Sequence, residues 1–293
     1  MTDPMTDPAA DPATLFARRP WRDSPAPPAA ALAVPTMLTD EEGRFYRWLT
    51  EHWLARRFPE GGEVVDLGCF VGGSTARLAA GHAAAGRPGL IHAYDFFTVS
   101  EGLKRQMLYP RGIARFKGED MLSLSRRLLA PWEDRVTFHR GDLMRRRWPA
   151  DEPVAALVID AAKSVALADH IAAQFFPALQ PGRSIVVQQD FLHRAQPWLP
   201  AQMELLADHF QPLVFLPDAS VSYLCLSVPG PAALAAARLE GRDDAALIAL
   251  VRAAARRLDG LCPAERFERQ VESLVSAPGT RVAWQFPQAP RDG

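Results

Sequence analysis

A glycine-rich segment at residues 63–75 holds the residue types best suited to chemistry in this chain. It reads EVVDLGCFVGGST, an apolar strand that breaks into a glycine loop and then opens a helix. A second apolar segment, residues 90–94, is followed by Asp95, where a carboxylate can accept hydrogen bonds from a ribose. The two segments together are typical of a βαβ unit that binds a nucleoside.

The spacing of the glycines argues against a dinucleotide. In Gly-x-Gly-x-x-Gly, the middle glycine lets the backbone approach a pyrophosphate. Gly68 and Gly73 fit the outer positions, but Phe70 stands at the middle one, where its side chain would crowd a pyrophosphate. We therefore expect a ligand that has a nucleoside and no phosphates, such as S-adenosylmethionine.

The pattern along the chain predicts a mostly parallel sheet. Apolar strands alternate with segments of helical character, which implies right-handed crossovers. The last two strands, 212–216 and 221–228, are too close in sequence for a crossover helix and should pair antiparallel. The five earlier strands are expected at 63–68, 90–94, 136–139, 154–160 and 184–189.

These residues resemble the first motif and the acidic loop of class I S-adenosylmethionine-dependent methyltransferases. The nearest branch is that of catechol-type and macrocin-type small-molecule O-methyltransferases. Its motif, Asp/Glu-x-Gly-x-x-x-Gly-x-Ser, is matched by Asp66, Gly68, Gly72 and Ser74. The resemblance covers about residues 38–228. It implies an α/β fold: a doubly wound, Rossmann-like sheet of seven mostly parallel strands, the last one antiparallel.

The resemblance also implies roles toward the cofactor. Asp66 would help to hold the methionine amino group, and Asp95 would bridge the ribose hydroxyls. Phe96 would lie on the adenine, and Asp142 would lie near the adenine amino group. Simpler interpretations are that Asp66 caps the loop, that Phe96 is a core aromatic, and that Asp142 belongs to an ordinary glycine–acid turn. The loop that would face the methionine carboxylate consists of Gly68, Cys69, Phe70, Gly72, Gly73 and Ser74.

The fourth strand ends in a candidate catalytic pair, Asp160 and Lys163. Catechol-type enzymes have at this spacing an Asp that binds a divalent cation and a Lys that acts as general base. A lysine can act as a base only if desolvation or a nearby cation lowers its pKa from about 10.4. The alternative is that Lys163 only forms an ion pair with Asp160. We also count Asp160 among the residues that bind the cofactor.

The fifth strand departs from the resembling family. Metal-dependent relatives end it with Asp-Asp or Asp-Asn, whereas Gln188 and Gln189 stand here. Losing these charges weakens a site for a hard cation, so we predict no metal. Asp190 and His193 follow at the expected ligand-binding edge of the sheet, and either could take a proton from the acceptor.

Composition restricts the class of protein further. The chain is 48% hydrophobic and 23% charged, with net charge −1, typical of a globular protein that does not bind nucleic acid. No apolar run approaches the roughly 20 residues of a membrane span. Three scattered cysteines and the absence of a visible secretory signal favour the cytoplasm.

The ends of the chain differ from residues 37–229, which we assign to the methyltransferase domain. Residues 1–36 are proline-rich, so we expect a disordered tail whose first 30 residues can be deleted without changing the melting temperature. Residues 230–293 should form a helical extension. We expect its apolar face to pack on the core, with a homodimer interface as the alternative.

The expected function is transfer of a methyl group from S-adenosylmethionine to a small molecule, such as a sugar or a secondary metabolite. The acceptor group would be a hydroxyl or, as the weaker choice, an amine. Two alternatives stay open at this point: a nicotinamide-dependent Rossmann oxidoreductase, and a non-catalytic protein that binds S-adenosylmethionine.

Overall fold

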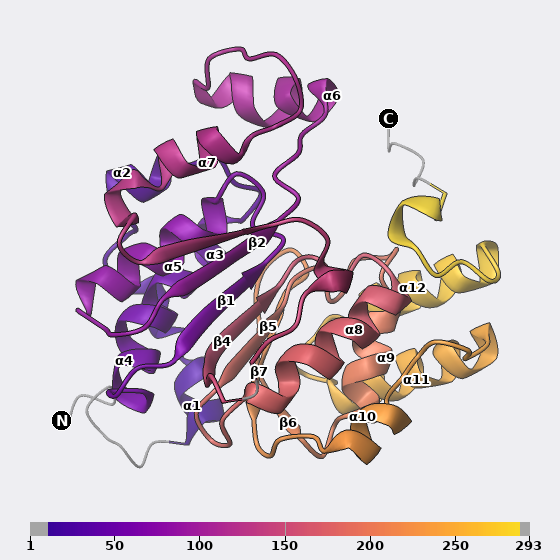
Figure 1. Cartoon of the computed structure of the whole chain (residues 1–293). Coiled ribbons are helices and arrows are strands. Elements are labelled where there is room, and N and C mark those ends of the chain that lie inside the picture. The colour runs from indigo at the N-terminus through magenta and orange to yellow at the C-terminus, as the bar shows by residue number, and fades with distance from the viewer. Residues whose placement is uncertain (1–10, 150, 288–293) are drawn as a thin grey trace.

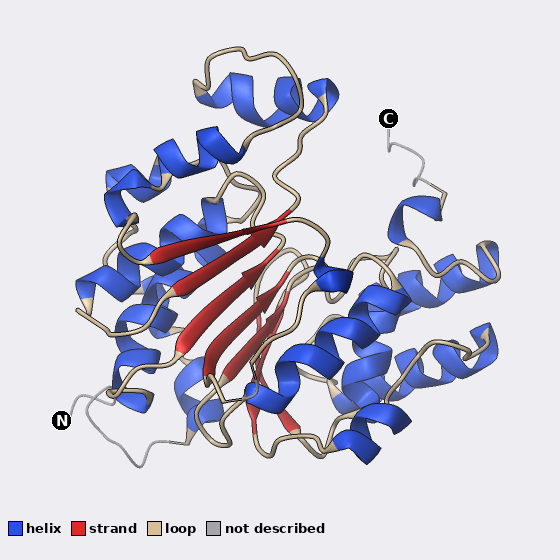
Figure 2. Ribbon diagram, in the orientation of Figure 1, coloured by secondary structure: helices blue, strands red, loops and turns tan. Residues whose placement is uncertain are grey.

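The computed structural model describes residues 11–149 and 151–287. Seven strands form one twisted sheet with helices on both faces (Figures 1 and 2). The strand order is β3-β2-β1-β4-β5-β7-β6, and only β7 runs antiparallel to its neighbours. The predicted fold class is confirmed. The strands are β1 (Glu63–Leu67), β2 (Ile91–Asp95), β3 (Val136–Arg140), β4 (Val154–Ile159), β5 (Ile185–Gln188), β6 (Phe210–Phe215) and β7 (Val221–Cys225).

Each face of the sheet has its own apolar core. Strand β4 lies between β1 and β5, and all six of its residues are buried, as expected of a parallel strand covered on both faces. One face is covered by α1 (Pro12–Ala17), α2 (Ala29–Leu32), α3 (Asp40–Trp48), α4 (Leu54–Arg57), α5 (Gly73–Ala84) and α7 (Leu122–Leu128). The other is covered by α8 (Val165–Phe175), α9 (Trp198–Leu205), α10 (Pro231–Ala236), α11 (Asp244–Arg257) and α12 (Ala264–Ser276).

Shorter helical segments connect these elements. Two are π-helical: Leu49–Trp53 joins α3 to α4, and Lys104–Leu108 follows α6 (Glu101–Leu103). The 3-10 segments are η1 (Pro20–Arg22), η4 (Tyr109–Arg111), η5 (Ala130–Trp132), η6 (Leu143–Arg145), η7 (Phe176–Ala178) and η8 (Ala283–Gln285). Within the described parts of the chain, no helix is both long enough and apolar enough to cross a bilayer.

The prediction of a disordered N-terminal tail is wrong for residues 11–36, while residues 1–10 lie outside the described residues. Phe16 and Trp21 are fully buried, and Phe16 packs edge-on against Trp53 with ring centroids 5.2 Å apart. The guanidinium of Arg77 on α5 donates to the carbonyl of Ala31 at 3.1 Å. Few apolar residues are present here, but they are large, and aromatic burial outweighs the proline content.

The C-terminal helices pack on the sheet rather than standing apart. Leu247 and Val251 of α11 are fully buried in the core beside α9. The carboxylate of Asp169 on α8 accepts hydrogen bonds from the backbone N–H groups of Leu239 and Glu240, at 3.0 and 2.9 Å. Val275 of α12, in contrast, is 65% exposed.

Replacing Trp21 with alanine should destabilise the protein by about 3–5 kcal/mol, because it opens a large cavity among aromatic side chains. Urea unfolding measures this change. Leu32→Ala is the control: Leu32 lies in the same segment but is 52% exposed, so the change should stay within about 0.5 kcal/mol. Equal effects of the two variants would mean that the segment does not dock as described.

Candidate functional site

A cavity of about 620 Å³ opens at the carboxyl ends of the parallel strands. Ligands of open α/β sheets bind at this edge, where strand order reverses. The loops after β1, β2, β3, β4 and β5 all contribute to its wall. Segments outside the sheet also contribute, among them residues 35–38 before α3 and Trp284 near the C-terminus.

The loop after β1 has glycine where the chain is most crowded. At Gly68, where φ is +89°, a Cβ atom would lie 2.9 Å from the carbonyl carbon of Asp160 at the end of β4. At Gly73, a Cβ atom would lie 2.5 Å from the carbonyl oxygen of Pro35. The glycines therefore allow β1, β4 and the N-terminal segment to meet around one cavity.

Asp95 lies where the sequence predicted it, at the end of β2 and in the cavity wall. Its carboxylate accepts the backbone N–H groups of Phe70 at 2.9 Å and Phe97 at 2.7 Å. Burial raises the pKa of Asp95, and these two hydrogen bonds oppose the rise. The backbone of Phe70 is in the left-handed region, with a φ of +52°, and in this conformation its N–H points to Asp95.

Two further predicted residues border the same half of the cavity. Phe96 is 58% exposed although its side chain is large and apolar, and it lines the cavity instead of packing in the core. The side chain of Asp142 accepts the N–H of Met144 at 2.9 Å and begins the short helix η6. Asp142 therefore caps a turn and also lines the cavity.

Asp66 and Gly72 are not among the residues that line the cavity. Asp66 is only 1% exposed, and its Oδ2 atom accepts the hydroxyls of Ser74 at 2.8 Å and Thr75 at 2.6 Å. Burial raises its pKa to about 6, against the effect of these hydroxyls. The geometry thus gives Asp66 the capping role in the loop.

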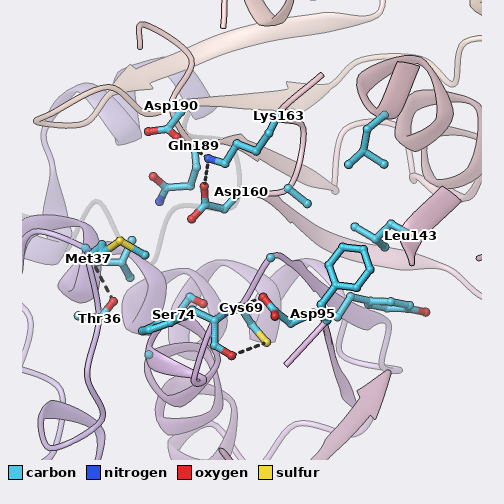
Figure 3. A pocket seen from close by; sticks show the side chains of 18 of the residues that line it. Thr36, Met37, Cys69, Ser74, Asp95, Leu143, Asp160, Lys163, Gln189 and Asp190 are labelled. Atoms are coloured by element: carbon cyan, nitrogen blue, oxygen red, sulfur yellow. Dashed lines mark hydrogen bonds and ion pairs between the residues drawn. The ribbon is translucent and has the colours of Figure 1, made fainter. Parts of the chain in front are cut away.

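Cys69 and Ser74 lie on the cavity wall beside Asp95 (Figure 3). The Cys69 side chain is buried, and desolvation raises the pKa of its thiol well above the ordinary value. A neutral thiol of this kind is a small apolar group rather than a nucleophile. Cys69 therefore contributes shape to the site.

Lys163 lies between two carboxylates on the opposite side of the cavity (Figure 3). Its Nζ atom is 2.6 Å from Oδ1 of Asp160 and 2.5 Å from Oδ2 of Asp190. Burial alone would lower the pKa of Lys163, but the charges of Asp160 and Asp190 outweigh it and raise this pKa above its ordinary value. Lys163 is therefore a fixed ammonium ion in this site.

The two carboxylates of this group differ in their affinity for a proton. Burial raises the pKa of Asp160, and Lys163 only partly compensates. For Asp190 the attraction of Lys163 outweighs burial and lowers the pKa. Gln196 adds a hydrogen bond to Asp190 at 2.8 Å. Of the two, Asp160 is the carboxylate better able to accept a proton.

The end of β5 carries two neutral glutamines where carboxylates would favour a divalent cation. Gln188 is buried and its amide nitrogen contacts the sulfur of Met203 at 3.6 Å. Gln189 contacts the hydroxyls of Tyr46 and Ser220. Across the described residues, no group of three or more His, Cys, Asp or Glu side chains is arranged to hold a metal.

His193 is not brought into the site. It is exposed, does not line the cavity, and its Nδ1 atom accepts the N–H of Ala195 at 3.2 Å. Partial desolvation of the ring by its neighbours lowers its pKa despite the nearby charge of Asp190. The prediction of His193 as a general base is therefore not supported by its position.

Sequence reasoning missed the residues that reach the cavity from outside the central motifs. The side chain of Glu42 is held by the capping box that it forms with Thr39, so Thr39-x-x-Glu42 was a signal for its position. Nothing in the sequence connected Trp284 with the glycine loop some 200 residues earlier. The further lining residues of this kind are Met37, Leu38 and Asp218.

Comparisons with known proteins support the fold through structure alone, since no protein-family model and no curated protein matches the sequence. The chain is similar to the O-methyltransferase NovP, with a TM-score of 0.52 and 15% identity over 66% of this chain and 82% of NovP. For a putative caffeoyl-CoA O-methyltransferase from Staphylococcus aureus the TM-score is 0.45 and the identity 13%, over 73% of this chain and 98% of that protein. For the SAH-bound methyltransferase PaMTH1 from Podospora anserina the TM-score is 0.44 and the identity 13%, over 73% of this chain and 95% of PaMTH1.

The fold is therefore that of the class I, Rossmann-like methyltransferases. The likeness to NovP and the strand order, with β7 inserted antiparallel between β5 and β6, agree on this point.

Replacing Asp95 with alanine should weaken binding of S-adenosylhomocysteine by about 1.5–3 kcal/mol, the range for hydrogen bonds to a charged group. Isothermal calorimetry on the purified chain measures this loss. Asp134→Ala is the matched control, because Asp134 is an aspartate with a 71% exposed side chain outside the cavity wall. Unchanged affinity in Asp95→Ala would remove Asp95 from the binding site.

Proposed function

We propose that this protein transfers a methyl group from S-adenosylmethionine to a hydroxyl group of a small molecule. One observation carries the proposal: a single cavity has Asp95 and Phe96 at one end and the Asp160–Lys163–Asp190 group at the other. The first end suits a nucleoside, and the second suits proton removal from an acceptor. The methyltransferase fold supports the same conclusion.

The residues present fit S-adenosylmethionine. Asp95 would hold the ribose, Phe96 would cover the adenine, and the loop at residues 68–74 would surround the methionine portion. When bound, this group supplies an electrophilic methyl on a positively charged sulfonium. The wall suits that charge, because it has one cation, Lys163, and six carboxyl side chains: Glu42, Asp95, Asp142, Asp160, Asp190 and Asp218.

Acceptor deprotonation is best assigned to Asp160. Lys163 holds its proton because it contacts two carboxylates, so it acts as an internal cation and not as the base. Its hydrogen bond uses Oδ1 of Asp160, and the raised pKa of this carboxyl brings its basicity closer to that needed at neutral pH. Lys163 and Asp190 therefore orient Asp160, while binding aligns the acceptor oxygen for in-line attack.

No step requires a divalent metal. The Lys163 ammonium lies between the only two carboxylates that end β4 and β5 in the described chain, so the position between them already has a positive charge. The neutral amides of Gln188 and Gln189 have other contacts. We therefore expect an activity that does not depend on a bound divalent ion.

Asp160→Asn should lower kcat by about 10²–10⁴-fold, the usual contribution of a general base. In the wild type Asp160 must be ionised to act as a base, so kcat/KM should fall as the pH decreases through the pKa of Asp160. Because that pKa is raised, the fall should occur above pH 3.8, the ordinary pKa of an aspartate. Steady-state kinetics against pH measures both. His193→Ala should leave kcat near the wild-type value, and loss of activity there instead would refute the assignment to Asp160.

The function itself is tested with methyl-labelled S-adenosylmethionine and a panel of phenols, sugars and amines, with and without EDTA. We expect label transfer to a hydroxyl acceptor, unchanged by EDTA, and thermal stabilisation by S-adenosylhomocysteine. Stabilisation by NAD instead would favour an oxidoreductase, and binding without transfer to any acceptor would favour a non-catalytic protein. Activity lost with EDTA and restored by Mg²⁺ would refute the metal-independent site.

A further inference from the structure

The C-terminal segment Arg281–Phe286, here called the C-terminal arm, pairs with the loop that carries Lys163. The N–H of Ala283 donates to the carbonyl of Lys163 at 2.9 Å, and the N–H of Val165 donates to the carbonyl of Arg281 at 3.0 Å. Ser164 and Val282 form an antiparallel bridge between these two bonds. The arm is therefore attached to the backbone of a residue in the proposed catalytic group.

Both ends of the arm are fixed independently of this pairing. The guanidinium of Arg281 lies 2.6 Å from the carboxylate of Asp244, the first residue of α11. At the other end Phe286 is buried near Trp198, with ring centroids 6.4 Å apart. The indole N–H of Trp198 in turn donates to the carbonyl of Ala162 at 2.7 Å. The arm is thus held as a rigid support on both sides of Trp284.

Trp284 lines the cavity and yet is 76% exposed. Met37, from the N-terminal segment, lines the same cavity and is 57% exposed. Exposed apolar surface that gathers at one concave site marks a ligand-binding surface. Of the eight large apolar side chains exposed in the described chain, three line this cavity: Met37, Phe96 and Trp284.

The position of Trp284 assigns it to the acceptor half of the cavity. Phe96 and Asp142 follow β2 and β3, so the nucleoside half lies toward that side of the sheet. Trp284 instead enters beside Lys163, after β4, which lies between β1 and β5. Its backbone therefore lies beside the loop of Lys163, and its side chain lines the cavity that also contains the group that we propose removes the acceptor's proton.

We propose that Trp284 determines acceptor specificity by packing against a flat, uncharged ring that carries the hydroxyl to be methylated. This inference rests on the proposed function of the same site. An indole presents a large flat apolar face, which suits a planar ring more than a flexible chain. An acceptor that bears a carboxylate or phosphate is disfavoured, since the one cation of the wall, Lys163, already contacts two carboxylates.

The test uses two matched probes, 7-hydroxycoumarin and its 3-carboxylate, below the pKa of the hydroxyl. Calorimetry on the full chain, with and without S-adenosylhomocysteine, measures their binding to the wild type, Trp284→Ala and Trp284→Phe. Val275→Ala is the control, because Val275 is a 65% exposed apolar residue of the same extension outside the cavity wall. Methyl-transfer kinetics with 7-hydroxycoumarin supplies KM and kcat.

We expect the wild type to bind 7-hydroxycoumarin more tightly than its carboxylate. Trp284→Ala should weaken that binding and raise KM by about tenfold, with kcat little changed. Trp284→Phe should restore most of the affinity, and Val275→Ala should behave as wild type. The affinity for S-adenosylhomocysteine should be equal in all four proteins.

Three results would overturn the proposal: no binding of the neutral ring to the wild type, equal affinity in Trp284→Ala, or a loss confined to S-adenosylhomocysteine binding. The last result would place Trp284 on the cofactor instead. Failure of the proposed function looks different, because S-adenosylhomocysteine would then bind to no variant and no label would be transferred.

Discussion

The placement of one ammonium ion between two carboxylates governs the site of this protein. Lys163 contacts Asp160 after β4 and Asp190 after β5, so a single positive charge links the ends of two neighbouring strands. Either carboxylate alone would be costly in a partly buried wall, and the lysine alone would lose its proton more readily. The two carboxylates keep Lys163 charged and Lys163 lowers the pKa of Asp190, while burial raises the pKa of Asp160.

The fifth strand ends in two neutral glutamines, Gln188 and Gln189, before Asp190. Both amide atoms of Gln189 are hydrogen-bonded to other side chains. Gln188 is buried with its amide nitrogen on the sulfur of Met203, and its carbonyl oxygen has no hydrogen-bond partner among the described residues. Gln189 instead joins Tyr46 of α3 and Ser220 before β7, so that the end of β5 is held from both sides. Gln189 is thus part of a polar network in the cavity wall.

Both ends of the chain contribute to the cavity, which lies at the edge of a sheet built from its middle. The N-terminal segment packs through Phe16 and Trp21 and brings Met37 to the wall. The C-terminal arm pairs with the loop of Lys163 and brings Trp284 there. The sheet provides a methyltransferase-like frame, and these two segments add exposed apolar side chains to the cavity wall.

The sequence by itself determined the sheet and the part of the cavity wall around Asp95. Strand periodicity and the loop from Gly68 to Ser74 are local signals, and parallel strands place the residues that follow them, such as Asp95 and Asp160, at one edge. Only the tertiary structure decided that His193 faces solvent, that Lys163 has two acidic partners, and that Trp284 reaches the cavity. Side-chain direction after a strand, charge pairing across strands and the path of a terminal segment depend on contacts between residues distant in sequence. Local composition does not encode these contacts, and for the same reason the proline-rich residues before Met37 concealed a buried aromatic cluster.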